Sequence, residues 1–505
     1  MLQSTTHESP QNNLTWWYWL IGITAAGFLI RAVNLNSQSF FYDEVVTARE
    51  AQSSFWALAS GIVRDNGNPP FFWILAKAAA ALFGLSETTL RGLALLAGTA
   101  ALPLFGLLGR RLFGGRAGLI AAALLAASPF SLEFSTEARV YPVVQLMAIA
   151  ATLLFLSWLE GKGLTALIPY VLLTALGCWS HYYFAFVPLA HGAAVIATRD
   201  GRRCLHWCAA MLVSALLYAF WLPVLLSQIR TPGNLARGGE KWLVQFLATP
   251  VAFTLGRSFA WKSASHGLLA FTMLAALLVF WLPALYALLR SKLARPYRIL
   301  LGAWLVLPVA IPLIIAVLKA PLYSARYGAI GMPALLLLVS AFLAELPPRR
   351  AIAMGVCIIT LCGISIVRFG YVPIKDDWRR ATAWLQPRLS PDGIVVVEPD
   401  EHAVTYLYHS RNIAQAPIDV LAVSSDSPLG GPIAAFLYHS GVRMDRVPMH
   451  HDSELYGHKK IWLLRLASAR PLDSYADLFR KHGFVRTGSA EFYGIDLAEF
   501  RTAVP

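Results

Sequence analysis

Charged residues are scarce in this sequence. Only 14% of the 505 residues are Asp, Glu, Lys or Arg, whereas 57% are hydrophobic, and the mean hydropathy is +0.55. Soluble domains carry about a quarter charged residues, so this composition excludes an ordinary soluble protein and indicates a membrane protein. The net charge of +14 does not indicate a nucleic-acid partner, because the basic residues are spread between apolar runs.

Cysteines and targeting signals are also few. None of the five cysteines lies after Phe369 or has metal-ligand spacing, so we expect the hydrophilic tail to fold without disulfides. Residues 1–15 lack the basic start and small-residue cleavage site of a secretory signal. The first apolar run, Trp16–Val33, is therefore predicted to be a retained signal-anchor span. The sequence has no internal repeat and no low-complexity tract.

Long apolar segments recur up to Phe369. Crossing a bilayer takes about 20 apolar residues in a helix, and the sequence predicts about eleven such spans. They are 16–35, 88–109, 117–132, 143–159, 164–182, 185–198, 206–228, 266–289, 299–318, 328–346 and 351–368. The two flanking His181 are short enough to form one broken helix.

The apolar run Pro69–Phe83 is excluded from these spans because it is short and contains Lys77. It fits an interfacial helix better. Without it, the short basic loops, such as Arg110–Arg116 and Arg349–Arg350, all fall on one side, which the positive-inside rule makes cytoplasmic. We therefore expect a cytoplasmic N-terminus, an extracytoplasmic C-terminus and a bacterial inner (plasma) membrane location.

The chain is predicted to have two domains and a mostly α fold. Residues 1–369 would form a polytopic helical bundle with interfacial helices in its first outer loop, and residues 370–505 a soluble extracytoplasmic α/β domain. In the tail, short apolar strands alternate with helix-like stretches. The strands are Gly393–Val397 and Ile461–Leu466, and the helices are Trp378–Leu385 and Tyr475–His482.

Two adjacent carboxylates, Asp43 and Glu44, follow the first span in an aromatic setting, Phe40-Phe41-Tyr42. Carboxylates among apolar residues at a membrane surface are costly unless they are paired or used. One interpretation is a general base that deprotonates an acceptor hydroxyl. The structural alternative is that they cap a helix over Val45–Leu58.

Cations and aromatic residues gather at other predicted outer boundaries. Glu137, Arg139 and Tyr141 lie in one outer segment, and an arginine there can bind a lipid phosphate through its fork of donors. A local Glu137–Arg139 pair, or an arginine that reaches the headgroups, is the structural alternative. His181, and Arg326 with Tyr327, have similar alternatives as a structural histidine and an aromatic belt with its anchoring cation.

The coincidence of these groups on one membrane face indicates a reaction with a lipid-phosphate leaving group. A carboxylate would activate the nucleophile, while cations stabilise the charge that develops on the departing phosphate.

The pattern resembles the GT-C glycosyltransferases, in the branch with the protein O-mannosyltransferases and the lipid A aminoarabinose transferase. The matching motifs run in the family's order over about the first 330 residues. They are Tyr42-Asp43-Glu44, Asn68-Pro69-Pro70-Phe71-Phe72, Leu82-Phe83-Gly84, Leu112-Phe113-Gly114, Ser135-Thr136-Glu137-Ala138-Arg139-Val140-Tyr141, His181-Tyr182 and Arg326-Tyr327.

The resemblance implies a catalytic base at Asp43, assisted by Glu44, and an inverting transfer from a polyprenyl-phosphate sugar. It places Arg139, Tyr141 and Arg326 around the donor. Glu137 and Tyr327 lie in the same motifs, and His181 and Tyr182 are expected to line the cavity. Many relatives have a histidine where this chain has Asn68, so a role of that histidine does not carry over.

We therefore expect a membrane glycosyltransferase whose partners are a polyprenyl-phosphate sugar donor, membrane lipids and a lipid, glycan or protein acceptor. A transporter or flippase of a lipid-linked sugar is the alternative; the lack of an inverted repeat argues against it. A purely structural role ranks third. No cofactor is expected, and a divalent metal lacks a clear ligand cluster.

Overall fold

The computed structural model describes residues 10–33, 35–59, 68–230, 242–257, 266–318, 323–371, 375–411, 420–423, 434–439, 442–448, 458–469 and 471–503. The chain forms two compact units. Unit 1 comprises Met1–Leu35 and Glu50–Val372, and unit 2 comprises Asn36–Arg49 and Pro373–Pro505. Unit 2 thus includes a segment that the sequence analysis placed in the transmembrane domain.

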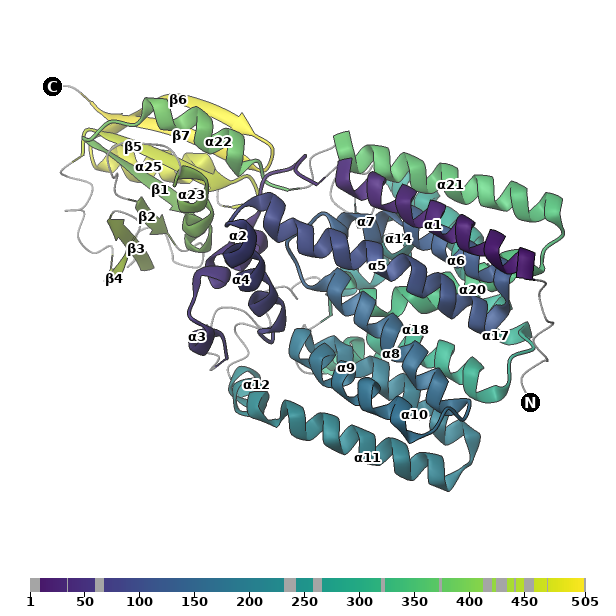
Figure 1. Ribbon diagram of the computed structural model, residues 1–505. Helices are drawn as coiled ribbons and strands as arrows, with labels where there is room; N and C mark the ends of the chain where they lie inside the picture. The colour runs from purple at the N-terminus through teal and green to yellow at the C-terminus, as the bar shows by residue number, and fades with distance from the viewer. Residues whose placement is uncertain are drawn as a thin grey trace. The chain divides into compact units, whose positions relative to one another are not determined.

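Unit 1 is helical (Figure 1). Its described α-helices are α1 (Pro10–Val33), α3 (Phe55–Ala59), α4 (Phe71–Phe83), α5 (Glu87–Phe113), α6 (Gly115–Ala127), α7 (Pro129–Ser135), α8 (Tyr141–Leu159), α9 (Leu167–Ser180), α10 (Phe186–Thr198), α11 (Gly201–Tyr218), α12 (Leu222–Arg230), α14 (Trp242–Leu255), α16 (His266–Ala276), α17 (Leu282–Arg290), α18 (Arg295–Leu318), α19 (Ala325–Gly328), α20 (Met332–Glu345) and α21 (Pro348–Tyr371). Short turns interrupt the series, among them η2 (Tyr182–Ala185) and η3 (Ala219–Trp221).

The chain is a multi-pass membrane protein. Within the described residues, 8 helices are long and apolar enough to span a membrane, or 9 if the bent pair α6 and α7 forms one span. The predicted count of about eleven also included α9 and α10, which have only 14 and 13 residues. His181 separates these two helices, because its extended backbone ends α9 before η2 begins.

The bend between α6 and α7 is stabilised by a buried arginine from α1. Ser128 and Pro129 break the helix, with an angle of 57° between the two parts. Arg31 donates to the carbonyls of Leu125 and Ala126 in the last turn of α6, where helix carbonyls need partners from outside the helix. It also donates to Ser131 and Ser135 of α7. The fully buried guanidinium therefore serves as a multiple hydrogen-bond donor that fixes the bend.

One feature of the first outer segment differs in detail from the sequence analysis, and another agrees with it. The helix expected over Val45–Leu58 is two helices, α2 (Tyr42–Gln52) and α3. Its interruption lies at Ser54, whose hydroxyl accepts from the Ala57 N–H at 3.1 Å and so starts α3 anew. The run expected to be interfacial forms α4, whose 13 residues are too few to be a candidate span.

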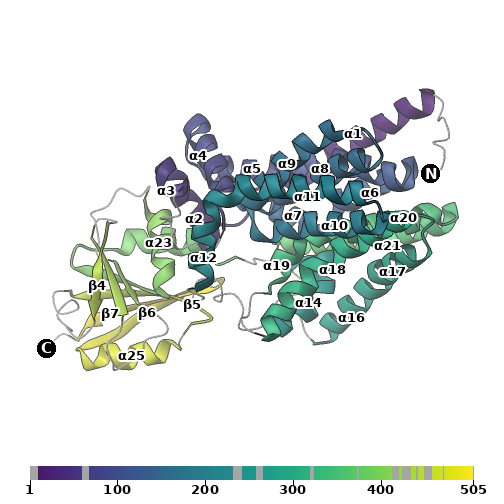
Figure 2. The same cartoon turned by 90° about the horizontal axis from the view of Figure 1, so that it is seen from below.

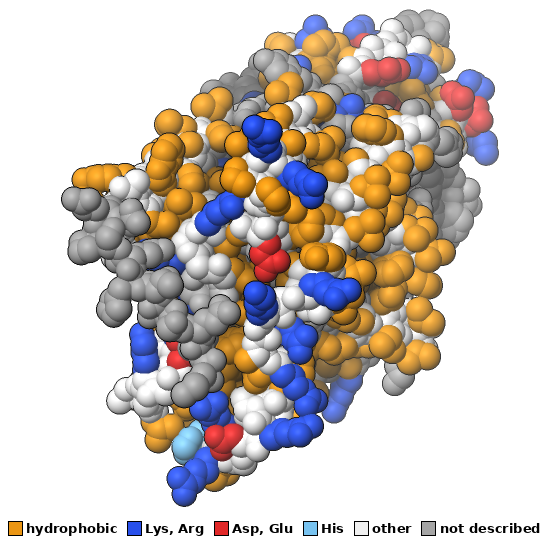
Figure 3. Space-filling view, turned by 90° about the vertical axis from the view of Figure 1, so that its right-hand side faces the viewer, with side chains coloured by type: hydrophobic (Ala, Val, Ile, Leu, Met, Phe, Trp, Pro, Cys, Tyr) orange, Lys and Arg blue, Asp and Glu red, His pale blue; other side chains and the backbone are white. Residues whose placement is uncertain are grey.

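Basic side chains gather at one end of unit 1. Figure 3 shows Lys and Arg side chains, with few acidic ones, surrounded by hydrophobic surface. The exposed basic residues in the terminal turns of apolar helices, or between these helices, include Arg116, Lys162, Arg199, Arg202, Arg290, Lys292, Arg295, Arg298, Arg349 and Arg350. Such segregation is what the positive-inside rule describes for a cytoplasmic face.

Unit 2 contains a seven-stranded sheet with helices beside it. The strands are β1 (Gly393–Glu398), β2 (Val420–Val423), β3 (Ala434–His439), β4 (Val442–Pro448), β5 (Lys460–Leu466), β6 (Phe484–Phe492) and β7 (Ile495–Thr502), and the helices are α2, α22 (Trp378–Leu385), α23 (Ala403–Ser410) and α25 (Leu472–Lys481). The strand order is β4-β3-β2-β1-β5-β7-β6, with β1 parallel to β2 and β5 and the other pairs antiparallel.

The sheet is buried on both faces around β1. Val395 and Val397 pack with Trp378 of α22 on one face, whereas Ile394 and Val396 pack on the other face, in the same cluster as Phe479 of α25. Figure 2 shows α23 and α25 on opposite sides of the sheet. The continuous apolar run of β1 thus reflects a strand covered on both sides. The expected α/β fold is confirmed, and so are the two predicted strands and the two predicted helices.

Candidate functional site

A buried arginine holds two carboxylates together in unit 1. Arg257 donates from its backbone N–H and from Nε to Glu133, at 3.0 and 3.1 Å to Oε2. Its Nη2 donates to Glu137 Oε1 at 2.5 Å. Both carboxylates are almost fully buried, where an unpaired charge would be costly. Arg257 therefore compensates both, and its guanidinium also covers the ring of Phe134 at 4.6 Å.

This arrangement requires a glycine before the arginine. Gly256 ends α14 with a φ of +78°, and a Cβ at this position would lie 2.5 Å from Glu133 Oε1. Any side chain here would collide with the carboxylate, and the left-handed backbone disfavours non-glycine residues. The turn brings the Arg257 N–H to Glu133, so glycine is necessary for the close approach.

An aromatic cavity lies in the same unit. Its polar lining includes Ser131, Tyr141, Gln145, His181, Tyr183 and Tyr327. The His181 ring contacts those of Tyr141 and Tyr327, with centroids 5.8 and 5.5 Å apart. His181 Nδ1 accepts from the Tyr183 N–H at 3.1 Å. Among the described residues its Nε2 is buried without a hydrogen-bond partner, so this ring edge can bind a polar ligand group.

Two further arginines lie close to this histidine. Arg139 and Arg326 are near enough for their charges to act on the His181 ring. The Arg139 guanidinium lies 5.9 Å from the ring centroid of Tyr141, and that of Arg326 lies 5.0 Å from that of Tyr327. Arg326 also donates to the Tyr327 hydroxyl at 3.2 Å. Cations and hydroxyls at one cavity make a suitable binding site for a phosphate.

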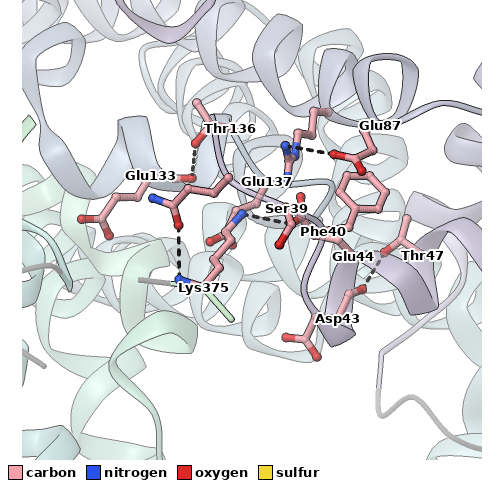
Figure 4. Close-up of polar contacts among 12 residues, drawn as sticks. Ser39, Phe40, Asp43, Glu44, Thr47, Glu87, Glu133, Thr136, Glu137 and Lys375 are labelled. Atoms are coloured by element: carbon pink, nitrogen blue, oxygen red, sulfur yellow. Dashed lines mark hydrogen bonds and ion pairs between the residues drawn. The ribbon is translucent and has the colours of Figure 1, made fainter. Parts of the chain in front are cut away.

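The two predicted catalytic carboxylates belong to unit 2. Asp43 and Glu44 both lie in the first turn of α2, where negative charge is favourable. Glu44 is fully buried and receives a hydrogen bond from Lys375 Nζ at 2.9 Å. Asp43 is half-buried, its side chain points away from that pair (Figure 4), and its backbone carbonyl accepts from Thr47. Glu44 is thus committed to an ion pair, and Asp43 is the better placed of the two for proton transfer.

The negative charge of Asp43 acts on a buried histidine, His402. The His402 ring stacks on that of Trp378 and contacts that of Tyr42, with centroids 5.6 and 5.3 Å apart. Burial lowers the pKa of His402 to about 4, and the negative charge of Asp43 opposes this effect. The ring is therefore neutral at physiological pH.

The lowered pKa of His402 predicts that unit 2 loses stability in acid. In the unfolded chain this histidine binds a proton below about pH 6.5, whereas in the folded unit it does so only below about pH 4. Between these values each unit by which the pH falls lowers the free energy of unfolding by about 1.4 kcal/mol. The total loss is about 3 kcal/mol. The loss can be measured as a fall in the urea midpoint of unfolding between pH 7 and pH 4, with the strand signal in circular dichroism as the readout. His402→Leu should flatten the dependence and His458→Leu should not; a wild-type midpoint independent of pH would contradict the prediction.

Within the described ranges, no cluster of three or more His, Cys, Asp or Glu side chains is placed to hold a metal ion.

The comparisons with known proteins agree with this architecture. Residues 67–226 match the family model described as dolichyl-phosphate-mannose-protein mannosyltransferase. The chain is similar to ArnT from Cupriavidus metallidurans. The apo crystal structure of ArnT matches with a TM-score of 0.59 at 14% identity, over 95% of this chain and 97% of the ArnT chain. The structure of ArnT bound to undecaprenyl phosphate gives a TM-score of 0.58 at 14% identity, covering 95% and 98%. The chain has the GT-C glycosyltransferase fold.

A larger GT-C protein is also similar. Arabinofuranosyltransferase AftD from Mycobacteria matches with a TM-score of 0.50 at 14% identity, over 97% of this chain and 42% of AftD. No curated protein sequence matches the chain. The similarity to these solved structures is one of fold.

Most of the residues predicted from sequence lie close together. Tyr141, His181 and Tyr327 line one cavity in unit 1, and the guanidinium groups of Arg139 and Arg326 lie beside the rings of Tyr141 and Tyr327. Glu137 lies beside them in sequence and is bound by Arg257.

Tyr182 is directed elsewhere. Its hydroxyl donates to Gln228 at 2.5 Å and accepts from Trp221 at 3.1 Å. Tyr183 is the neighbouring tyrosine that lines the cavity.

The sequence analysis missed the arginine and the lysine that pair with the buried carboxylates. Arg257 is 120 residues or more from its partners and Lys375 is 331 residues from Glu44. The only local signal for the first was Gly256-Arg257 directly after an apolar helix, which is a weak one. Lys375 lies three residues before α22, which begins at Trp378 with Asp377 as its N-cap.

Proposed function

We propose that this protein is an inverting glycosyltransferase that moves a sugar from a polyprenyl-phosphate donor to an acceptor hydroxyl. The observation that carries the proposal is the placement of Arg139 and Arg326 beside the rings of Tyr141 and Tyr327, which line a cavity together with His181. Cations and aromatic rings next to one cavity in a multi-pass membrane protein suit the phosphate of a lipid-linked sugar. The GT-C fold and the family-model match to residues 67–226 support the same conclusion.

The proposed chemistry separates an acceptor role from a donor role. Asp43 takes the proton from the acceptor hydroxyl as its oxygen attacks the anomeric carbon of the sugar. The bond between that carbon and the phosphate oxygen breaks, and polyprenyl phosphate leaves with the bonding electrons. Attack opposite the leaving group inverts the anomeric centre. Arg139 and Arg326 stabilise the charge that develops on the phosphate.

We further propose that transfer takes place on the extracytoplasmic face of a bacterial inner membrane. The basic end of unit 1 in Figure 3 supports this orientation, because basic segments between spans remain in the cytoplasm. The acceptor is then a lipid, a glycan or a protein hydroxyl that is accessible from outside.

Replacing Arg139 tests the donor site. Arg139→Gln should weaken the binding of polyprenyl phosphate by about tenfold or more, because one charge-assisted hydrogen-bond donor to phosphate is lost. Binding can be measured by fluorescence titration of the purified protein. Arg116→Gln, at an exposed basic position in the first turn of α6, is the matched control and should bind as the wild type does. Equal affinity in all three proteins would rule out Arg139 as a phosphate ligand.

A further inference from the structure

The segment that carries Asp43 and Glu44 belongs to the same compact unit as the sheet. The chain leaves unit 1 after Leu35, contributes residues 36–49 to unit 2, and returns at Glu50. The residues that form the sheet follow this segment in the sequence by more than 340 positions. A catalytic loop that folds with a distant domain depends on that domain for its conformation.

Lys375 connects the sheet region to the first turn of α2. Its Nζ donates to Glu44 at 2.9 Å, its backbone N–H donates to Gln38 Oε1 at 3.2 Å, and its ammonium lies 4.9 Å from the ring centroid of Phe41. Both partners in the ion pair are nearly excluded from solvent, with side chains 5% and 0% exposed. A buried, hydrogen-bonded pair of this kind fixes geometry, because losing either partner leaves an uncompensated charge.

The backbone around Lys375 is itself held by the sheet. The Asp377 N–H donates to the Tyr493 carbonyl at 2.9 Å, at the turn between β6 and β7. Asp376 lies so close to Gly494 that a Cβ on this glycine would be 2.1 Å from Asp376 Oδ1. The carbonyl of Asp376 in turn accepts from the Ser39 hydroxyl at 2.9 Å. The β6–β7 turn therefore sets the position of the segment that binds residues 38–44.

Helix α23 supports the same segment from a second direction. His409 Nε2 donates to the Phe40 carbonyl at 3.0 Å, and the Phe40 ring stacks on Tyr408 with centroids 5.5 Å apart. His402 contacts Tyr42, the first residue of α2. The residues before Asp43 are thus bound both by the segment 375–376 and by α23.

We propose that the C-terminal sheet unit is a positioning element for the carboxylates of the first outer segment, with Lys375 as the positioning residue that sets the start of α2 through Glu44. The inference rests on the proposed transfer function. Lys375 itself takes no part in the chemical step. Its loss displaces Asp43, and displacements of about 1 Å can lower a rate about 100-fold.

Lys375→Met in the full-length protein tests the proposal. We expect kcat to fall about 10-fold to 100-fold, with the KM for the polyprenyl-phosphate donor within about threefold of wild type. Hydrogen–deuterium exchange should increase in residues 36–49 while β1 and β5 remain protected. Lys375→Arg, which keeps the charge, should recover much of the rate. Arg480→Met is the matched control, because it removes an exposed pair with Asp477 in the same unit, and should change neither measurement.

A glycine pair provides a second test that leaves the ion pair's chemistry intact. Gly494 and Gly483 both have positive φ, at +75° and +80°. A Cβ at Gly494 would strike Asp376, whereas at Gly483 it would meet nothing within 4 Å. Gly494→Ala should therefore lower kcat and loosen residues 36–49, and Gly483→Ala should show only the cost of the backbone conformation. If Lys375→Met does not fold, this pair of glycine variants still tests the proposed positioning role.

The outcomes separate the inference from the proposed function. Lack of transfer by the wild-type protein would refute the function, and the exchange measurement would still report whether the sheet orders residues 36–49. A wild-type enzyme whose Lys375→Met and Gly494→Ala variants keep kcat within twofold, with unchanged exchange, would overturn the inference alone.

Discussion

Asp43→Asn should reduce sugar transfer about 100-fold to 10,000-fold, the usual cost of losing a general base. The substitution keeps the shape of the side chain and removes only its basicity. Thr47 bonds the backbone carbonyl of Asp43, and Lys375 bonds Glu44, so neither contact depends on the altered group. Folding and donor binding should therefore persist. Initial rates at saturating donor, compared with wild type, measure the effect.

The matched control for this variant is Asp477→Asn. Asp477 lies in the same unit on α25, and its side chain is 69% exposed in an ion pair with Arg480. Its replacement should leave the rate unchanged, because exposed pairs contribute little. A near-normal rate for Asp43→Asn would show that another group accepts the proton.

Arg257→Met should destabilise unit 1 by about 3–5 kcal/mol, the cost of leaving buried charges without their partner. The substitution removes the guanidinium bonds to Glu133 and Glu137 together and keeps the bond from the backbone N–H to Glu133. Because both carboxylates adjoin the predicted donor site in sequence, transfer should fall as well. Thermal unfolding followed by intrinsic tryptophan fluorescence measures the first effect.

Two further variants sharpen this test. Arg203→Met removes an exposed pair with Asp200 and should cost less than about 1 kcal/mol. Arg257→Lys keeps the charge but cannot reproduce the fork that binds two carboxylates, so it should recover only part of the stability. An unfolding temperature for Arg257→Met equal to that of wild type would contradict the assigned role.

Local sequence patterns predicted the elements better than the contacts between them. The helix expected over Trp378–Leu385 has these bounds in the structure, because its apolar spacing and the preceding Asp377 cap are local signals. The strand expected over Gly393–Val397 ends one residue later, at Glu398. Apolar periodicity and capping are properties of neighbouring residues, so the sequence alone contains them.

Contacts between distant segments could not be predicted in the same way. The sequence analysis expected Glu44 to assist Asp43, the predicted base, and did not foresee that Lys375 binds Glu44. It assigned the first outer segment to the transmembrane domain, because chain order gave no sign of pairing with the tail. It proposed Tyr182 for the cavity, where a turn of the chain places Tyr183. Each of these depends on tertiary packing that no local pattern records.

The most direct test of the proposed function is a transfer measurement with a doubly labelled donor. A polyprenyl-phosphate sugar with one label on the phosphate and another on the sugar is incubated with the purified wild-type protein in vesicles and a membrane-extract acceptor pool. We expect one polyprenyl phosphate to be released for each sugar that appears on the acceptor. Donor that stays intact while it crosses the vesicle membrane would contradict it and indicate a transporter of lipid-linked sugar.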